Sequence, residues 1–156
     1  MKKLLVLAVI ALFTINSNAQ EGFKVGVNAG IPVGDFSDFL SFTASLDLSY
    51  DWAVSEGFNA GLISGITYNF GKDGIDALKY APIAALARVN VSDEFELGAD
   101  IGMAVSLESG GGSDFYWRPV VAYALNETTD IQASYSNVSG DGVTLSSFNL
   151  GAAFRF

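Results

Sequence analysis

FELGADIGMAVSL, residues 95–107, alternates between two kinds of side chain with a period of two. Every odd-numbered position from Phe95 to Leu107 is apolar, whereas the even-numbered positions carry Glu96, Asp100 or small residues. Successive side chains of a β-strand point to opposite faces. The stretch therefore predicts a strand with one apolar face and one polar face.

The same alternation recurs along the chain. It runs from Phe42 to Val54 on even-numbered positions. Six further segments fit it, at residues 22–33, 57–70, 80–91, 114–125, 129–137 and 143–156. No Asp, Glu, Lys or Arg falls on the apolar face of these eight segments. Their lengths suit the roughly 9–11 residues that a tilted transmembrane strand requires.

The connections between these segments alternate in length. Those at 55–57, 92–93 and 126–128 are tight, and longer ones rich in Gly and Asp follow the other segments, at 34–41, 71–79, 108–113 and 138–142. This arrangement predicts an all-β fold, an eight-stranded antiparallel up-and-down transmembrane β-barrel with both termini on the side of the short turns. Pro82 and Pro119 fall inside predicted strands, where we expect a bulge to accommodate the missing N–H.

The polar face distinguishes a membrane barrel from a soluble lipocalin-like carrier, whose apolar side chains would line a cavity. A water-exposed outer surface would be rich in Lys, Glu and Arg. Here the polar face consists mostly of Gly, Ser and Asn, which suit the narrow lumen of eight strands. Aromatic residues also gather at two heights, as in the girdles at the two membrane interfaces. The predicted girdles comprise Trp52, Phe58, Phe95 and Tyr123 near the short turns, and Tyr68, Phe70, Phe115 and Trp117 near the longer loops.

The first residues have the pattern of a secretory signal peptide. Lys2 and Lys3 precede an apolar run from Leu4 to Phe13, and Ala19 ends a small-x-small motif. We expect residues 1–19 to be a signal peptide and residues 20–156 to form the barrel domain.

Composition restricts the chemistry. The 156 residues contain no Cys and no His, which excludes thiolate nucleophiles, imidazole bases and the usual zinc and haem ligands. We therefore expect no enzyme, no cofactor and no metal centre. A formal net charge of −9 disfavours nucleic acid as a partner. Acidic residues near the predicted loops either bind divalent cations that bridge lipopolysaccharide or simply solvate the loops; they are Asp35, Asp38, Asp73, Asp76, Glu108, Asp114 and Asp141.

The final segment carries the most specific resemblance to a known family. Its last residues alternate and end in an aromatic side chain, with Phe148, Leu150, Phe154 and Phe156 on one face. This resembles the C-terminal assembly signal of the OmpX/OmpA-like outer-membrane β-barrels of Gram-negative bacteria, and the resemblance covers the whole predicted barrel. It implies an outer-membrane location, lipid and lipopolysaccharide as neighbours, and recognition by the outer-membrane assembly machinery during biogenesis. Family members include adhesion factors and lipid-modifying enzymes, and the enzymes depend on a His that this chain lacks.

Charged side chains on the polar face would point into the lumen, where they must be paired. From strand height we expect Arg88 beside Glu96, Arg118 beside Asp100, and Lys24 and Arg155 near Asp130. The full set of predicted lumen charges is Lys24, Arg88, Arg118, Arg155, Asp47, Asp51, Glu96, Asp100 and Asp130.

Two functions fit this pattern. The first is a monomeric, non-enzymatic barrel that serves as a surface scaffold in envelope integrity or adhesion, its lumen closed by ion pairs. The second is a narrow porin-like channel for ions or very small solutes. The sequence ranks a soluble lipocalin-like carrier behind both.

Overall fold

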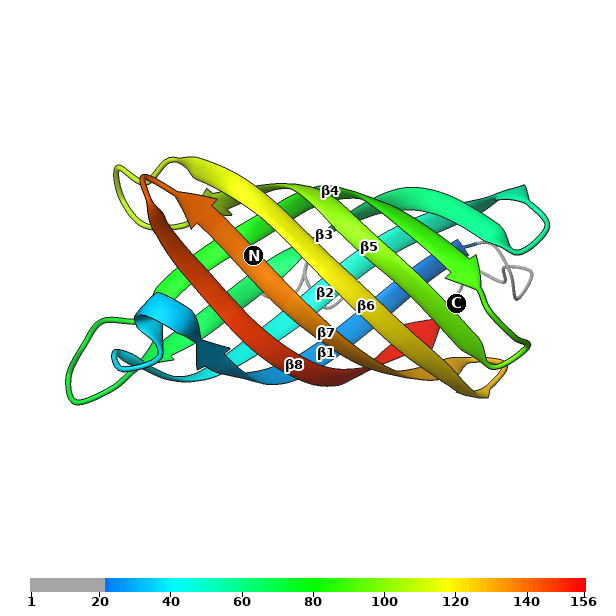
Figure 1. Ribbon diagram of the computed structural model, residues 1–156, viewed down its shortest axis with the longest axis horizontal. Coiled ribbons are helices and arrows are strands. Elements are labelled where there is room, and N and C mark those ends of the chain that lie inside the picture. The colour runs from blue at the N-terminus through cyan, green and yellow to red at the C-terminus, as the bar shows by residue number, and fades with distance from the viewer. Residues whose placement is uncertain (1–21) are drawn as a thin grey trace, which may run out of the picture.

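The computed structural model describes residues 22–156 and shows a closed barrel, drawn along its length in Figure 1. The predicted signal peptide at residues 1–19 lies outside the described residues. Within those residues, no helix is long and apolar enough to cross a membrane. The strands are β1 (Gly22–Val33), β2 (Leu40–Ser55), β3 (Phe58–Gly71), β4 (Leu78–Asn90), β5 (Phe95–Ser106), β6 (Ser113–Asn126), β7 (Thr129–Gly140) and β8 (Val143–Arg155).

Each strand pairs antiparallel with the next, and β1 closes the barrel against β8. This confirms the predicted fold class. A short 3₁₀ turn at Gly34–Phe36 follows β1, in a loop where the sequence predicted no helical structure. Both ends of the described chain lie at the end of the barrel that carries the short turns, on the right of Figure 1.

The apolar face of the strands points outward. Leu46, Ile101 and Leu150 are 46%, 57% and 68% exposed, whereas Asp47 and Asp100 are 4% and 0% exposed. The predicted orientation is thus confirmed. It argues against a lipocalin-like carrier, because the same side chains would then line a cavity.

The prediction of a longer loop at residues 138–142 is wrong. Strands β7 and β8 continue to Gly140 and Val143, which leaves only Asp141 and Gly142 between them. Both residues have positive φ, 49° and 79°. A two-residue Asp-Gly connection with positive φ at both positions is a type I′ hairpin turn, whose twist matches that of the strands.

The bulges predicted at Pro82 and Pro119 are also wrong. Pairing of β3 with β4 stops at Ser64↔Ile83 and resumes at Thr67↔Tyr80 in the same register, and β6 with β7 is interrupted similarly around Pro119. The strands accommodate proline by leaving a gap in the ladder. The register shifts lie instead at strand ends, for example between Ala53 and Ser55.

The buried apolar core lies inside the barrel, toward the end that carries the longer loops. Its residues come from β3 to β7, and most lie near the strand ends that join those loops. Small side chains and two tyrosine rings make up much of this cluster. The cluster comprises Ile63, Tyr80, Ala84, Leu86, Ala104, Tyr116 and Val138.

Candidate functional site in the barrel lumen

All nine charged residues predicted to face inward lie on the lumen side of the strands. The alternation of each strand places them there, since their chain neighbours on both sides occupy the outer face. None of the nine is exposed. They occupy the half of the lumen nearer the short turns, below the apolar core.

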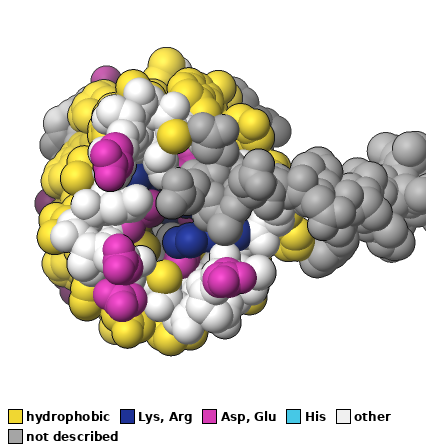
Figure 2. All heavy atoms as spheres, turned by 90° about the vertical axis from the view of Figure 1, so that its right-hand side faces the viewer, with side chains coloured by type: hydrophobic (Ala, Val, Ile, Leu, Met, Phe, Trp, Pro, Cys, Tyr) yellow, Lys and Arg dark blue, Asp and Glu magenta, His cyan; other side chains and the backbone are white. Residues whose placement is uncertain are grey.

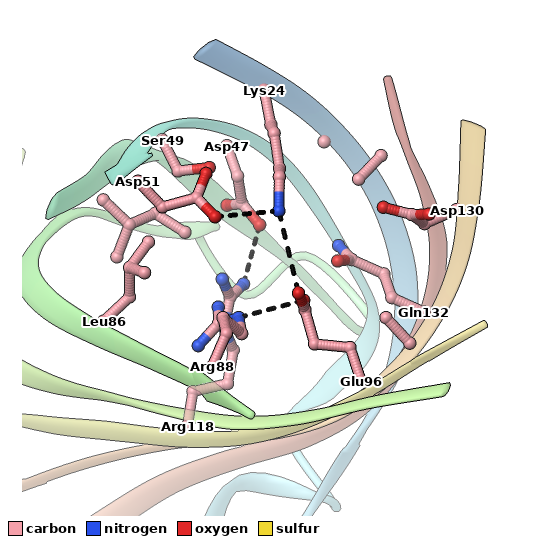
Figure 3. Close-up of a pocket in the computed structure, with 14 residues that line it drawn as sticks. Lys24, Asp47, Ser49, Asp51, Leu86, Arg88, Glu96, Arg118, Asp130 and Gln132 are labelled. Carbon is pink, nitrogen blue, oxygen red and sulfur yellow. Dashed lines mark hydrogen bonds and ion pairs between the residues drawn. The ribbon is translucent and has the colours of Figure 1, made fainter. Parts of the chain in front are cut away.

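Lys24 begins a continuous series of contacts. Its ammonium Nζ lies 3.1 Å from Asp51 Oδ2 and 3.9 Å from Glu96 Oε2. Glu96 in turn lies 3.7 Å from Arg88 Nε through its Oε1. Figure 3 shows these side chains converging from β1, β2, β4 and β5 on the axis of the barrel. The Lys24 ammonium thus joins strands on opposite sides of the lumen.

The series continues into the most deeply buried part of the site. Arg88 Nη2 lies 2.6 Å from Asp100 Oδ1, and Arg118 Nε lies 2.8 Å from the other oxygen of the same carboxylate. Arg118 Nη1 donates to Asp47 Oδ2 at 2.7 Å. Asp100 is completely buried and held between two guanidinium groups. Burial of a carboxylate is tolerable only with such compensation.

The side-chain amides of Asn28 and Gln132 extend the network to β7. Asn28 Nδ2 donates to Asp47 Oδ2 at 2.8 Å, and Gln132 Nε2 donates to Asn28 Oδ1 at 2.6 Å. A single network therefore connects side chains of β1, β2, β4, β5, β6 and β7. It spans the lumen across its width.

Arg155 forms a separate pair with Asp130, through Nε at 2.9 Å and Nη2 at 2.6 Å. The predicted placement of Lys24 in that group is wrong. Lys24 and Arg155 are direct partners in the β1–β8 pairing, and like charges opposite each other repel. Each side chain therefore turns to a different carboxylate, and Lys24 goes to Asp51 and Glu96.

Little space is left between these side chains. The cavity that they line has a volume of about 30 Å³, room for one or two water molecules. Asp47 Oδ1 and Asp51 Oδ1 are buried without a hydrogen-bond partner among the described residues. Water in this cavity would satisfy both oxygens.

Two tyrosines above the network were missed by the sequence reasoning. Tyr80 and Tyr116 are 7% and 2% exposed, and their ring centroids lie 6.3 Å apart across the lumen. Both occupy the inward positions of their strands, as Arg88 and Arg118 do. Their even numbers, shared with Arg88 and Arg118 on the same strands, could have predicted that they face the lumen.

The acidic loop residues do not converge. Among residues 22–156, no group of three or more Asp or Glu side chains is placed to hold a metal ion. Asp35 instead accepts a hydrogen bond from the backbone N–H of Thr144 at 3.0 Å, which ties the first loop to β8.

The predicted girdle residues lie on the outer face. Trp52, Phe70, Phe95, Phe115, Trp117 and Tyr123 are exposed, and Phe58 and Tyr68 are half-buried. Several form ring pairs, such as Phe95 with Tyr123 at 4.9 Å and Tyr68 with Phe70 at 4.5 Å.

The last strand places its apolar residues on the same outer face. Phe148, Leu150 and Phe154 are exposed. Phe156 is half-buried and lies against Phe23, with ring centroids 6.5 Å apart. Its backbone N–H donates to the carbonyl oxygen of Phe23 at 2.9 Å.

The short-turn end of the barrel combines these features. Figure 2 shows Lys and Arg side chains within the opening, Asp and Glu side chains around it, and hydrophobic side chains along the outer wall. An apolar exterior and a charged interior are the features of a membrane barrel. Residues 4–156 of the chain match the model of one family, described as outer membrane protein beta-barrel domain. The chain belongs to that family. It is accordingly an outer-membrane β-barrel protein.

Solved structures of other members of this architecture resemble it in fold. Ail of Yersinia pestis in a phospholipid nanodisc is 18% identical, with a TM-score of 0.58 over 87% of this chain and 100% of that one. A de novo designed transmembrane β-barrel is 13% identical, with a TM-score of 0.60 over 91% and 100% of the two chains. The outer membrane enzyme PagL is 14% identical, with a TM-score of 0.55 over 85% and 99%. Identities this low establish the fold alone. A comparison with curated protein sequences finds no match.

Proposed function

We propose that this outer-membrane barrel is a monomeric, non-enzymatic scaffold whose lumen is closed to solutes. Its short turns and both termini face the periplasm, and its longer loops face the outside. Its neighbours are outer-membrane lipid and lipopolysaccharide. Its role is in the integrity of the envelope.

The continuous lumen network carries this proposal. Side chains from six strands meet across the axis, and the space left among them measures about 30 Å³. A conducting pore needs a continuous water-filled path, as in barrels of many more strands. The tyrosine pair above the network adds a second obstruction at a different height.

The non-enzymatic part rests on composition and on geometry. PagL shows that a barrel of this architecture can be an enzyme, so the fold does not decide the matter. This chain has no His and no Cys. Its buried carboxylates are held by guanidinium and ammonium groups, which leaves them poorly suited to proton transfer.

Envelope integrity is favoured over adhesion by the size of the loops. The longer connections span only residues 34–39, 72–77 and 107–112, and the fourth is a two-residue turn. Ail is named an attachment invasion locus protein, and adhesion is the alternative that this relative suggests. A deletion strain tests both: sensitivity to detergents, restored by the wild-type gene, supports the proposal, whereas loss of surface attachment with unchanged sensitivity supports adhesion.

The C-terminal pattern suggests how the protein reaches the membrane. We attribute recognition by the assembly machinery to the alternating residues of the last strand, Phe148, Leu150, Phe154 and Phe156.

Planar-bilayer recording tests the closed lumen. We expect no steady conductance from the purified wild-type protein. A variant with Lys24→Ala, Tyr80→Ala, Tyr116→Ala and Arg118→Ala removes the tyrosine pair and the two cations that reach across the lumen. It should produce conductance steps, provided that a heat-modifiable gel band shows that it folds. Steady conductance from the wild type would overturn the closed scaffold and establish the narrow channel instead.

A further inference from the structure

The opposite end of the lumen contains a larger cavity that the closed scaffold does not use. Its volume is about 220 Å³, and it lies above the tyrosine pair, at the end with the longer loops. Its walls are mostly apolar, formed by Phe36, Leu78, Tyr80, Val138, Val143 and Leu145.

The cavity is a blind pocket. Tyr80 forms part of its lining, and the buried ring of Tyr116 lies beside Tyr80. The ion-pair network fills the lumen beyond them. A molecule that enters from the outside therefore has no way through, so that the pocket is suited to binding.

Three charged residues line the pocket, Lys79, Glu108 and Asp114, and two of them are acidic. Glu108 and Asp114 lie at its rim. The Asp114 carboxylate lies close to Gly140, whose lack of a Cβ leaves room for it.

Lys79 contributes to the lining of the pocket, but its ammonium group is directed away from the two carboxylates. The Lys79 ammonium lies 5.2 Å from the centroid of the Tyr68 ring, on the outer face of the barrel. The Lys72 ammonium donates to the carbonyl oxygen of Ser37 at 2.8 Å. The mouth of the pocket therefore combines apolar walls with negative charge.

We propose that this pocket binds a small amphipathic cation, an apolar group about the size of an aromatic ring that carries an amine. A dry cavity of about 150 Å³ in another protein accommodates benzene, so about 220 Å³ accommodates a ring with a short side chain. The ring would lie among Leu78, Val138 and Leu145, and the amine would lie between Glu108 and Asp114. The same amine could belong to a free metabolite or to the N-terminus of a peptide.

The experiment uses isotopically labelled protein in zwitterionic phosphocholine nanodiscs, titrated with phenethylamine and followed by amide NMR. We expect saturable shifts at Leu78, Ala104 and Val138, with a dissociation constant of about 1 mM or tighter, as befits so few heavy atoms. Phenylacetate, which has the opposite charge and a similar shape, should bind at least threefold more weakly, by roughly the strength of exposed charge pairs. A phenylalanyl dipeptide distinguishes the two sources, because a peptide site should bind it as tightly as phenethylamine.

Matched variants test the charge and the place. Glu108→Gln with Asp114→Asn should weaken phenethylamine binding about threefold to fivefold. Asp93→Asn with Glu127→Gln makes the same change in net charge at exposed positions of the short-turn end, and should leave binding unchanged. Val143 lines the pocket and is exposed to solvent, so Val143→Trp should block the pocket without disturbing the core. Absence of saturable shifts, equal binding of phenylacetate, or equal effects of the two double variants would overturn the proposal.

Discussion

Asp100 and Arg118 face each other directly in the β5–β6 pairing, and their side chains meet at 2.8 Å inside the lumen. Arg118 also reaches Asp47, which lies 71 positions away along the chain. One guanidinium thus compensates two buried carboxylates from different strands. Its removal would leave Asp47 without its cationic partner and Asp100 with Arg88 alone.

Replacement of Arg118 by Leu should therefore destabilise the barrel by about 3–5 kcal/mol, the usual cost of an uncompensated buried charge. Urea unfolding in lipid vesicles, followed by the heat-modifiable gel shift, measures this loss. Lys79→Leu is the control, because its ammonium lies over the Tyr68 ring on the outer face, a contact that should contribute only about 0.5–1 kcal/mol. Equal losses in the two variants would contradict a special role for the buried network.

The outward apolar face makes a second prediction. Leu46 lies between the aromatic residues of β2 and is 46% exposed. Leu46→Lys should cost about 2–4 kcal/mol of unfolding free energy, since it places a charge near the middle of the bilayer. Val54→Lys, beyond Trp52 at the end of the same strand, should cost less than about 1 kcal/mol. A similar cost at both positions would show that the assumed depth is wrong.

The β7–β8 turn makes a third prediction. Gly142 has φ 79° and open space around its Cα, so Gly142→Ala introduces backbone strain without a clash. We expect a loss of about 1 kcal/mol in the same unfolding assay. Gly112 also has open space around it, but no positive φ. Gly112→Ala should be neutral or slightly stabilising, and a loss as large as that of Gly142→Ala would refute the strain argument.

The last residue makes a fourth prediction, which concerns assembly in cells. Phe156→Ala should reduce the fraction of protein that reaches the outer membrane several-fold, measured by fractionation and unboiled gel electrophoresis. Ile131→Ala removes an outward apolar residue from β7 and serves as the control. If purified Phe156→Ala refolds normally in vesicles while its yield in cells falls, the defect lies in recognition. A normal yield of Phe156→Ala in the outer membrane would show that Phe156 is not part of an assembly signal.

Much of this architecture follows from the alternation itself. A charge that faces lipid is costly, so the parity of Asp47, Asp100 and Arg118 predicts which face of each strand points inward. Pairs between neighbouring strands also follow, because short turns determine the register. Arg88 and Glu96 lie together for this reason, across the short turn between β4 and β5. Arg118 and Asp100 lie on strands joined by a longer loop, and their pairing follows from their equal height along β6 and β5.

Contacts across the lumen do not follow from one strand and its neighbour. The reach of Arg118 to Asp47, or of Lys24 to Glu96, depends on the diameter of the closed barrel and on the stagger of its strands. The pocket at the loop end depends further on the 3₁₀ turn that brings Phe36 to its wall. The alternation predicts the strands, but it contains no information about how the loops close over them.

The interrupted pairing at the two prolines has a mechanical consequence. The β4–β5 and β5–β6 ladders are continuous, whereas β3–β4 and β6–β7 each lack contacts at a proline. Under a pulling force, the weakest boundaries of the cylinder should therefore be those two. The three strands between them, β4, β5 and β6, would separate from the rest as one ribbon. A force trace would then record the rupture of the pairings within that ribbon as a single event, after the two boundaries have parted.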